Sequence, residues 1–222
     1  GSRGDLKGHL EFLAAAALAA PEREKLAAYA HAAKLREGAP LAFRTMLTRF
    51  ARNPEWARED ALAIAANPDE FDPPLAGDGP TPLDDLSLLV TDDAALRALA
   101  AMKNPPRPKP LLTLRVLGLT GLPLVLRQKG DGAFIKDELA EALSVVESVE
   151  AAEVLAELLA HRPKDKQGAA ATARGYFTRR PDLAVAVLGK HLGGKSKLAP
   201  LAAPLVTRAL ADNPGLEALL TK

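Results

Sequence analysis

Residues 149–163 read VEAAEVLAELLAHRP, and this stretch shows the helical pattern of the chain most clearly. Apolar residues such as Ala151, Leu155 and Leu158 recur at the spacing of one helical face, while glutamates recur along a second, displaced stripe. Proline disfavours helix at the residue before it, so Arg-Pro ends the segment. The stretch therefore predicts a helix over residues 149–161 with one buried face and one acidic edge.

The rest of the chain shares this composition. Ala and Leu make up 83 of the 222 residues, whereas Val and Ile contribute 12 and aromatic residues 9. Ala and Leu lose little side-chain entropy in a helix, and strands favour the β-branched and aromatic residues that are scarce here. The composition predicts an all-α protein of one or two domains, long enough to bury a substantial core without disulfides.

Prolines divide the chain into short helices. Several follow Asn or Arg at the end of an apolar turn, as in Asn53-Pro54 and Arg180-Pro181, where proline suits the first position of the next helix. We expect helices near residues 5–19, 22–36, 40–52, 54–66, 82–90, 92–103, 110–118, 122–129, 133–146, 149–161, 166–179, 182–192 and 198–211, and a partial helix at 215–221.

One long connection interrupts the helices. Residues 67–82 contain five prolines, two glycines and four acids, a composition that sustains neither helix nor strand. We expect an N-terminal four-helix portion over residues 1–66, this acidic connection, and a helical-repeat portion over residues 83–222.

The later helices fall into pairs. Their first members begin near residues 133, 166 and 198, an offset of 32 or 33 residues. Helix pairs that repeat in this way stack into an α-solenoid, whose long surfaces remain free for partners. The alternative is an irregular helical bundle in which the spacing is a coincidence.

Residues 179–190 (RRPDLAVAVLGK) and the following KSKLA from Lys195 carry a resemblance to a known family. They resemble helical-repeat segments of large bacterial WGR-associated, molybdate-metabolism-regulator-like proteins. The similarity extends over about residues 150–215, and HEAT-type repeats look similar there too. The resemblance implies a HEAT-like repeat scaffold within a longer bacterial protein, with no catalytic residue to transfer.

A phosphate-loop pattern lies inside the same region. Gly189, Gly194, Lys195 and Ser196 satisfy G-x-x-x-x-G-K-[ST], in which backbone N–H groups and the lysine hold phosphates. Such a loop needs a parallel sheet and a later carboxylate on a strand, and no alternation of strands and helices precedes it. We interpret the glycines as a turn between helices and the pattern as a lookalike.

Other patterns that carry catalysis are absent from the sequence. There is no cysteine, and the histidines at positions 9, 31, 161 and 191 lie at no spacing that would pair them on a metal. Asp84-Asp85 and Asp92-Asp93 occur at expected helix starts, where acids cap the helix and favour its dipole. The residues therefore predict no enzyme, no metal and no cofactor.

Charge is segregated although the net charge is +1. Residues 137–160 carry seven acids and no Lys or Arg, whereas residues 161–200 carry nine bases and two acids. These nine form a candidate binding surface, the basic rim: Arg162, Lys164, Lys166, Arg174, Arg179, Arg180, Lys190, Lys195 and Lys197.

The basic rim admits two kinds of partner. Clustered cations attract phosphate, so nucleic acid is one candidate, through contacts whose affinity falls steeply with salt. The neighbouring acids make ion pairs within the chain, or docking to another protein, an equally natural use of the same residues. We expect a cytoplasmic, noncatalytic scaffold that binds a protein partner, with nucleic-acid binding as the alternative and no role for a membrane.

Overall fold

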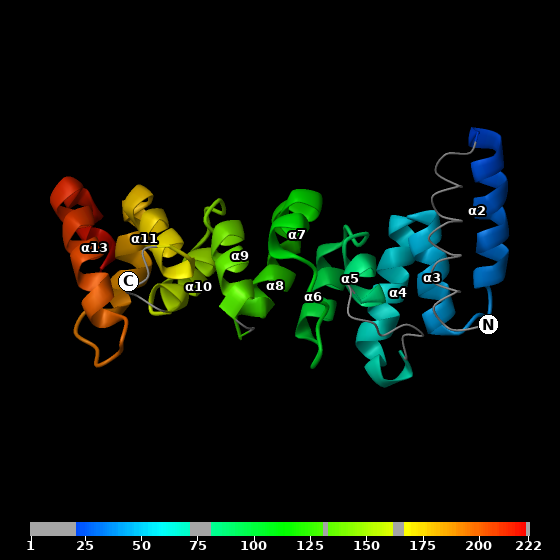
Figure 1. The fold of residues 1–222 in the computed structure, drawn as a ribbon, viewed down its shortest axis with the longest axis horizontal. Coiled ribbons are helices and arrows are strands. Elements are labelled where there is room, and N and C mark those ends of the chain that lie inside the picture. The colour runs from blue at the N-terminus through cyan, green and yellow to red at the C-terminus, as the bar shows by residue number, and fades with distance from the viewer. Residues whose placement is uncertain (1–20, 72–80, 131–132, 162–166, 221–222) are drawn as a thin grey trace. The chain divides into compact units, whose positions relative to one another are not determined.

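The computed structural model describes residues 21–71, 81–130, 133–161 and 167–220. All regular structure in these ranges is helical, and they contain no strand, which confirms the all-α fold (Figure 1). The expected helix at 5–19 and most of the connection at 67–82 lie outside the described residues.

The chain divides into two compact units. The first contains the residues up to Pro108 together with Arg115–Leu124, and the second contains Lys109–Leu114 and the residues from Val125 onward. The helices that follow the connection at 67–82, α5 (Pro82–Ser87) and α6 (Asp93–Ala101), also belong to the first unit. The connection therefore lies within the first unit and does not mark its end.

In the first unit the described helices match the sequence-based ranges closely. They are α2 (Glu22–Arg36), α3 (Leu41–Ala51), α4 (Pro54–Ala66), η1 (Pro68–Glu70), α5 (Pro82–Ser87), α6 (Asp93–Ala101), the end of α7 (Pro110–Leu117), η2 (Gly118–Gly121) and the start of α8 (Leu122–Leu126).

Short-range hydrogen bonds explain where these helices begin. The Asn53 side chain accepts hydrogen bonds from the backbone N–H groups of Glu55 (2.9 Å) and Trp56 (3.1 Å). Thr81 and Asp84 form a reciprocal capping box at α5. Asp92 accepts from the backbone N–H of Ala95 at 2.8 Å. Asn53, Thr81 and Asp92 are therefore N-caps, which confirms the capping role predicted for Asp92.

The core of the first unit joins helices on both sides of the connection. Ile64 of α4 lies in one buried cluster with Leu86 of α5 and with Leu96 and Leu99 of α6. All four side chains are fully shielded from solvent, and full burial of one such side chain contributes about 1.5–3 kcal/mol to folding. This shared core holds α4, α5 and α6 together.

The second unit begins in α7 and continues through helices that pack mainly on their neighbours. Its elements are the end of α8, η3 (Arg127–Gly130), α9 (Ala133–Leu143), α10 (Val149–Leu159), α11 (Ala169–Arg179), α12 (Pro181–Leu183), η4 (Ala184–Leu188), η5 (Gly189–His191), α13 (Ala199–Asp212) and η6 (Pro214–Leu219).

Within the second unit α9, α10 and α11 pack on one another, and α13 packs on η4. The largest fully buried side chains of its core are Leu139, Leu143, Leu155, Leu159, Tyr176, Phe177 and Leu188. The apolar stripe expected over residues 149–161 is buried, while Glu150, Glu153 and Glu157 are exposed. The amphipathic pattern therefore predicted correctly which face of α10 is buried.

Three expected helices differ from the structure. The range 122–129 is α-helical only over α8 and continues as a 3₁₀ turn over Arg127–Gly130. The range 182–192 contains a short α-helix, a π-helical turn over Ala184–Leu188 and a 3₁₀ turn over Gly189–His191. Four of the five π-turn residues are buried, so packing of a nearly all-apolar segment overrides the regular α-helical pattern. The end of the chain forms 3₁₀ turns over Pro214–Leu219 in place of an α-helix.

Candidate functional site

The basic rim lies in the second unit. Arg162, Lys164 and Lys166 are outside the described residues. The other six lie on or just after α11, in η5, and in the loop before α13: they are Arg174, Arg179, Arg180, Lys190, Lys195 and Lys197.

Arg180 ties the end of α11 to the turn between α9 and α10. Its guanidinium forms an ion pair with Glu147 in that turn and another, at 3.3 Å, with Asp182. The hydrogen bond from Arg180 lowers the pKa of the Asp182 carboxyl, and the hydrogen bonds to Asp182 and Glu147 raise the pKa of Arg180. Two carboxylates therefore compensate the charge of Arg180.

A buried hydrogen bond reinforces the same junction. The Tyr176 hydroxyl donates to the backbone carbonyl of Val146 at 3.0 Å, and burial raises the pKa of Tyr176. At the other end of α11, the backbone N–H of Ala169 donates to Asp137 Oδ1 of α9 at 2.6 Å. Both ends of α11 are thus bonded to the preceding helix pair.

The acidic stripe of α10 meets lysines from two elements. Lys190 Nζ of η5 lies 3.2 Å from Glu153 Oε1, and Lys129 Nζ of η3 lies 2.8 Å from Glu157 Oε1. Each of these side chains is more than half exposed, so the pairs contribute little to stability. The exposed side of α10 therefore carries glutamates that are paired with lysines from η3 and η5.

Four of the six described members of the basic rim lie near the ends of helices, whereas Arg174 lies in the middle of α11. Arg179 and Arg180 follow Tyr176 at the end bonded to the α9–α10 turn. Lys195 and Lys197 lie in the loop before α13, drawn in orange at the opposite end of these helices (Figure 1). The end of α11 and the loop before α13 therefore carry these two pairs of cations at opposite ends of the neighbouring helices.

Three cations of the rim are exposed and form no ion pair with a described residue. They are Arg179, Lys195 and Lys197. Arg179 folds back along its own helix, so that its Nη1 lies 3.4 Å from the position a methyl group would take at Gly175. Among the described members of the basic rim, these three are therefore the exposed cations without an ion pair.

The phosphate-loop pattern adopts a turn that follows a helix. Gly189 begins η5 and Gly193 has φ 95°. The backbone N–H groups of Leu192 and Gly194 donate to the carbonyls of Gly189 (3.1 Å) and His191 (3.3 Å). These N–H groups form hydrogen bonds within the turn, whereas in a phosphate loop the backbone N–H groups point at the ligand. Lys195 and Ser196 are exposed.

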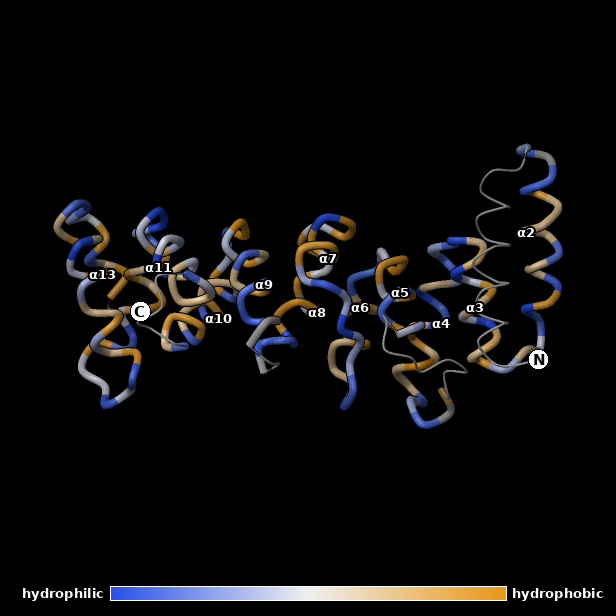
Figure 2. The backbone as a smooth tube through the Cα atoms, in the orientation of Figure 1, coloured by the Kyte–Doolittle hydropathy of each residue, from blue (hydrophilic) through white to orange (hydrophobic). Residues whose placement is uncertain are grey.

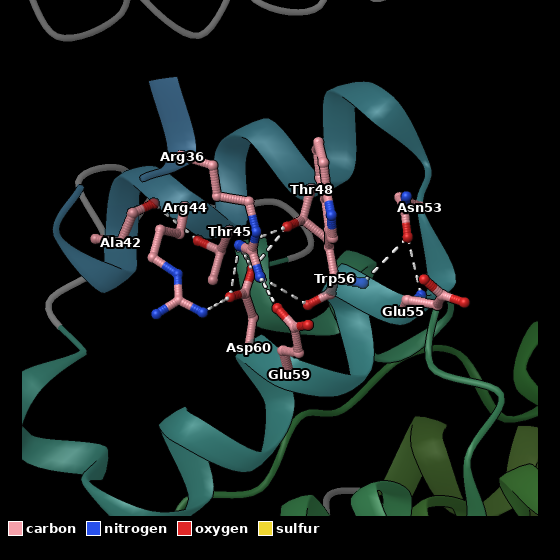
Figure 3. Close-up of polar contacts among 10 residues, drawn as sticks. All are labelled: Arg36, Ala42, Arg44, Thr45, Thr48, Asn53, Glu55, Trp56, Glu59 and Asp60. Carbon is pink, nitrogen blue, oxygen red and sulfur yellow. Dashed lines mark hydrogen bonds and ion pairs between the residues drawn. The ribbon is translucent and has the colours of Figure 1, made fainter. Parts of the chain in front are cut away.

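The most elaborate polar cluster lies in the first unit, at residues that none of the sequence motifs above includes. We name it the Asp60 network; its members are Arg36, Arg44, Thr48, Trp56, Glu59 and Asp60 (Figure 3). Asp60 is fully buried and Arg36 is 8% exposed. Buried charges of this kind require partners, because loss of hydration is costly.

Asp60 accepts from three side chains. Arg36 Nη1 donates to both carboxylate oxygens at 2.8 Å, Arg44 Nη2 lies 2.8 Å from Oδ1, and Thr48 Oγ1 donates to Oδ2 at 2.6 Å. The second nitrogen of Arg36 donates to Glu59 Oε2 at 2.8 Å and to the Trp56 carbonyl at 3.4 Å. Two arginines and two carboxylates balance the charge of the network.

A signal for this network exists in the sequence. Asp60 follows Ala57 by three residues and precedes Ala61 and Ile64, so it interrupts the apolar stripe of a helix. A carboxylate in that position is desolvated on folding and needs a cation. The identity of that cation, Arg36 from another helix, is not encoded by any local spacing.

No group of three or more metal-binding side chains is found among the residues the structure describes. His31 is exposed, His161 and His191 are partly buried, and His9 lies outside the described ranges. One described stretch, Pro110–Lys129, has the length and hydropathy of a membrane span, a property it shares with core helices. Gly118, with φ 59°, divides it between α7 and α8.

Comparisons with protein-family models, curated proteins and solved structures find no match for this chain.

Proposed function

We propose that this chain is a noncatalytic helical-repeat scaffold that binds a protein partner. In this proposal the helix pairs from α9 onward stack as HEAT-like repeats of an α-solenoid within a longer bacterial protein. The scaffold acts in the cytoplasm, without a cofactor and without insertion into a membrane.

The observation that carries the proposal is the surface where the α9–α10 turn meets the end of α11. We name it the turn surface; its members are Val145, Glu147, Val149, Arg179, Arg180 and Asp182. Val145 is 74% exposed and Val149 is 45% exposed. Exposed aliphatic side chains bordered by charges of both signs suit a protein interface, which combines an apolar centre with a polar border.

The same chemistry disfavours a polyanion as the main partner. Arg180 and Lys190 are paired with Glu147 and Glu153, and these glutamates would repel phosphate. Nucleic-acid binding remains the second candidate because Arg179, Lys195 and Lys197 are exposed and form no ion pair with a described residue. Under that alternative these three cations contact phosphates.

Capture of the partner from a lysate of the source organism tests the first proposal. We compare the wild type with a Val145→Glu/Val149→Glu variant, and use Ala203→Glu/Thr207→Glu, at exposed positions of α13, as the matched control. A specific protein should be retained by wild type and control and lost by the turn-surface variant. The captured protein is then purified and titrated by calorimetry. Equal binding to all three variants would contradict a role for the turn surface.

Fluorescence anisotropy with labelled DNA and RNA tests the alternative. Contacts to phosphate should be strong at about 50 mM salt and weaken steeply as salt rises. The informative variant is Arg179→Glu/Lys195→Glu/Lys197→Glu, and the control with equal charge change is Lys34→Glu/Arg52→Glu/Lys103→Glu, at exposed positions of the first unit. Binding lost only in the first variant would establish nucleic-acid recognition, and no binding to wild type would exclude it.

A further inference from the structure

Helix α2 contributes little apolar surface to the described core. Among its described side chains only Ala32 and Arg36 are buried, and Tyr29 adds an edge-to-face contact with Phe50 of α3 at 6.3 Å. Hydrophilic and hydrophobic residues alternate along α2 without separating into two faces (Figure 2). An alanine and part of one ring bury a small area, so Arg36 is the main anchor of α2 on α3 and α4.

The site that receives Arg36 is built entirely by α3 and α4. We name it the guanidinium pocket; its members are Thr48 of α3 and Trp56, Glu59 and Asp60 of α4. Their oxygens accept from both terminal nitrogens of Arg36, with contacts of 2.8 Å to Asp60 and Glu59. The Trp56 ring lies 5.2 Å from the guanidinium carbon, within range of a cation–π interaction (Figure 3).

The pocket retains a net negative charge when Arg36 is removed. Among the described residues, the cation then paired with Asp60 is Arg44, which lies 2.8 Å from Asp60 Oδ1. A buried site with an excess carboxylate favours a cation. Oxygen acceptors that bind both terminal nitrogens beside an aromatic ring favour a guanidinium. Lysine presents a compact point charge and does not match this arrangement.

We propose that the guanidinium pocket is a binding site for the arginine of a partner peptide, occupied here by Arg36 of the same chain. A competing arginine side chain takes the place of Arg36, and α2 then leaves α3 and α4. This site belongs to the first unit and is independent of the turn surface.

Competition from Arg36 determines how tightly the pocket binds an external arginine. Arg36 is tethered to its pocket and acts at a high effective concentration, so an external arginine binds the wild type weakly. Replacement of Arg36 by alanine removes the competitor. The apparent affinity for external arginine then rises by the ratio of all wild-type molecules to those in which the pocket is free of Arg36.

Titration of the full chain with N-acetylarginine amide tests the proposal, with N-acetyllysine amide as the matched ligand. Trp56, the only tryptophan of the chain, reports binding through its fluorescence. Arg36→Ala should bind the arginine amide about tenfold or more tighter than wild type. The lysine amide should bind neither protein, and Arg36→Ala/Asp60→Asn should bind neither ligand. Equal binding of the two amides, or no gain in Arg36→Ala, would overturn the proposal.

Hydrogen exchange of the wild type provides a readout that does not depend on the folding of any variant. The arginine amide at high concentration should speed amide exchange in residues 22–36, while the lysine amide leaves it unchanged. Residues 93–101 of α6 serve as the internal control, because they lie in the core cluster of the same unit. Unchanged exchange in α2 with the arginine amide would show that Arg36 is not displaced.

Discussion

The Tyr176 hydroxyl donates a hydrogen bond to the carbonyl oxygen of Val146 at 3.0 Å, across 30 residues of sequence. Tyr176 is fully buried, so the bond connects α11 to the turn between α9 and α10 in a site closed to water. The same junction carries the ion pair of Arg180 with Glu147. The turn surface therefore owes its geometry to a buried contact beneath it.

Replacement of Tyr176 by phenylalanine should destabilise the protein. The change leaves the Val146 carbonyl without its partner and costs about 1–2 kcal/mol in the free energy of unfolding. Urea unfolding followed by circular dichroism measures this loss. Tyr29→Phe, which removes a hydroxyl from a partly buried ring on α2, is the control and should cost less. Equal losses in both variants would contradict the importance of the Tyr176 bond.

Because the pKa of Tyr176 is raised, the stability of the protein should depend on pH in the alkaline range. The folded state holds the phenolic proton more tightly than the unfolded state, whose pKa is near 10.0. The stability contributed by Tyr176 is therefore fully present below pH 10 and is lost as pH rises through the folded-state pKa. Wild type should lose more stability than Tyr176→Phe above pH 10. Parallel stability curves would contradict the raised pKa.

Asp60→Asn should weaken the first unit strongly. The substitution removes the charge that Arg36 and Arg44 compensate, and uncompensated burial of one partner costs about 3 kcal/mol. Unfolding monitored by Trp56 fluorescence reports the loss, because this residue belongs to the same network. Asp85→Asn removes a carboxylate that is 40% exposed and paired with Arg49, and should cost less than about 1 kcal/mol. A smaller effect at Asp60 than at Asp85 would refute the assignment.

Asp182 should confer stability that depends on pH in the acidic range. Its folded-state pKa is lowered from 3.8 by the hydrogen bond from Arg180, so folding favours the ionised carboxylate. This contribution is present above about pH 3.8 and is lost as pH falls through the lowered pKa. The difference in Tm between wild type and Asp182→Asn should be visible at pH 6 and should shrink toward pH 2. A constant difference would contradict the pairing.

Two glycines with positive φ allow backbone strain to be separated from crowding. Gly168 has φ 90° and a methyl group there would lie 2.9 Å from Asp137 Oδ1, whereas Gly193 has φ 95° and open space. Gly193→Ala should cost about 1 kcal/mol from strain alone, and Gly168→Ala about twice as much or more. Thermal unfolding of both variants measures the difference, and equal costs would rule out crowding against Asp137.

Local chemistry made much of the helix pattern predictable. Asn53, Thr81 and Asp92 cap helices through hydrogen bonds within three residues, and Pro54 starts α4 at the expected position. The segment after Pro181 was less predictable, because burial of Ala184–Leu188 against α13 and η6 replaces the α-helix by a π-turn. Short-range bonds are encoded in spacing, whereas this packing depends on distant segments.

The basic rim shows the same division between local and long-range information. The sequence identified its cations and the acids of α10, but pairing joins residues 28 and 37 positions apart in Lys129–Glu157 and Lys190–Glu153. The direction of each helix places the end of α11 and the loop before α13 at opposite ends of these helices, which no count of charges could predict.

The helical character of the described chain, the ends of most of its helices and the buried face of α10 follow from local patterns, since caps, prolines and apolar stripes act within one or two helical turns. The common core of α4, α5 and α6 and the pairing of Arg36 of α2 with Asp60 of α4 became visible only in the folded chain. These contacts join segments far apart in the chain, and their energies arise from desolvation and packing that exist only once the helices meet.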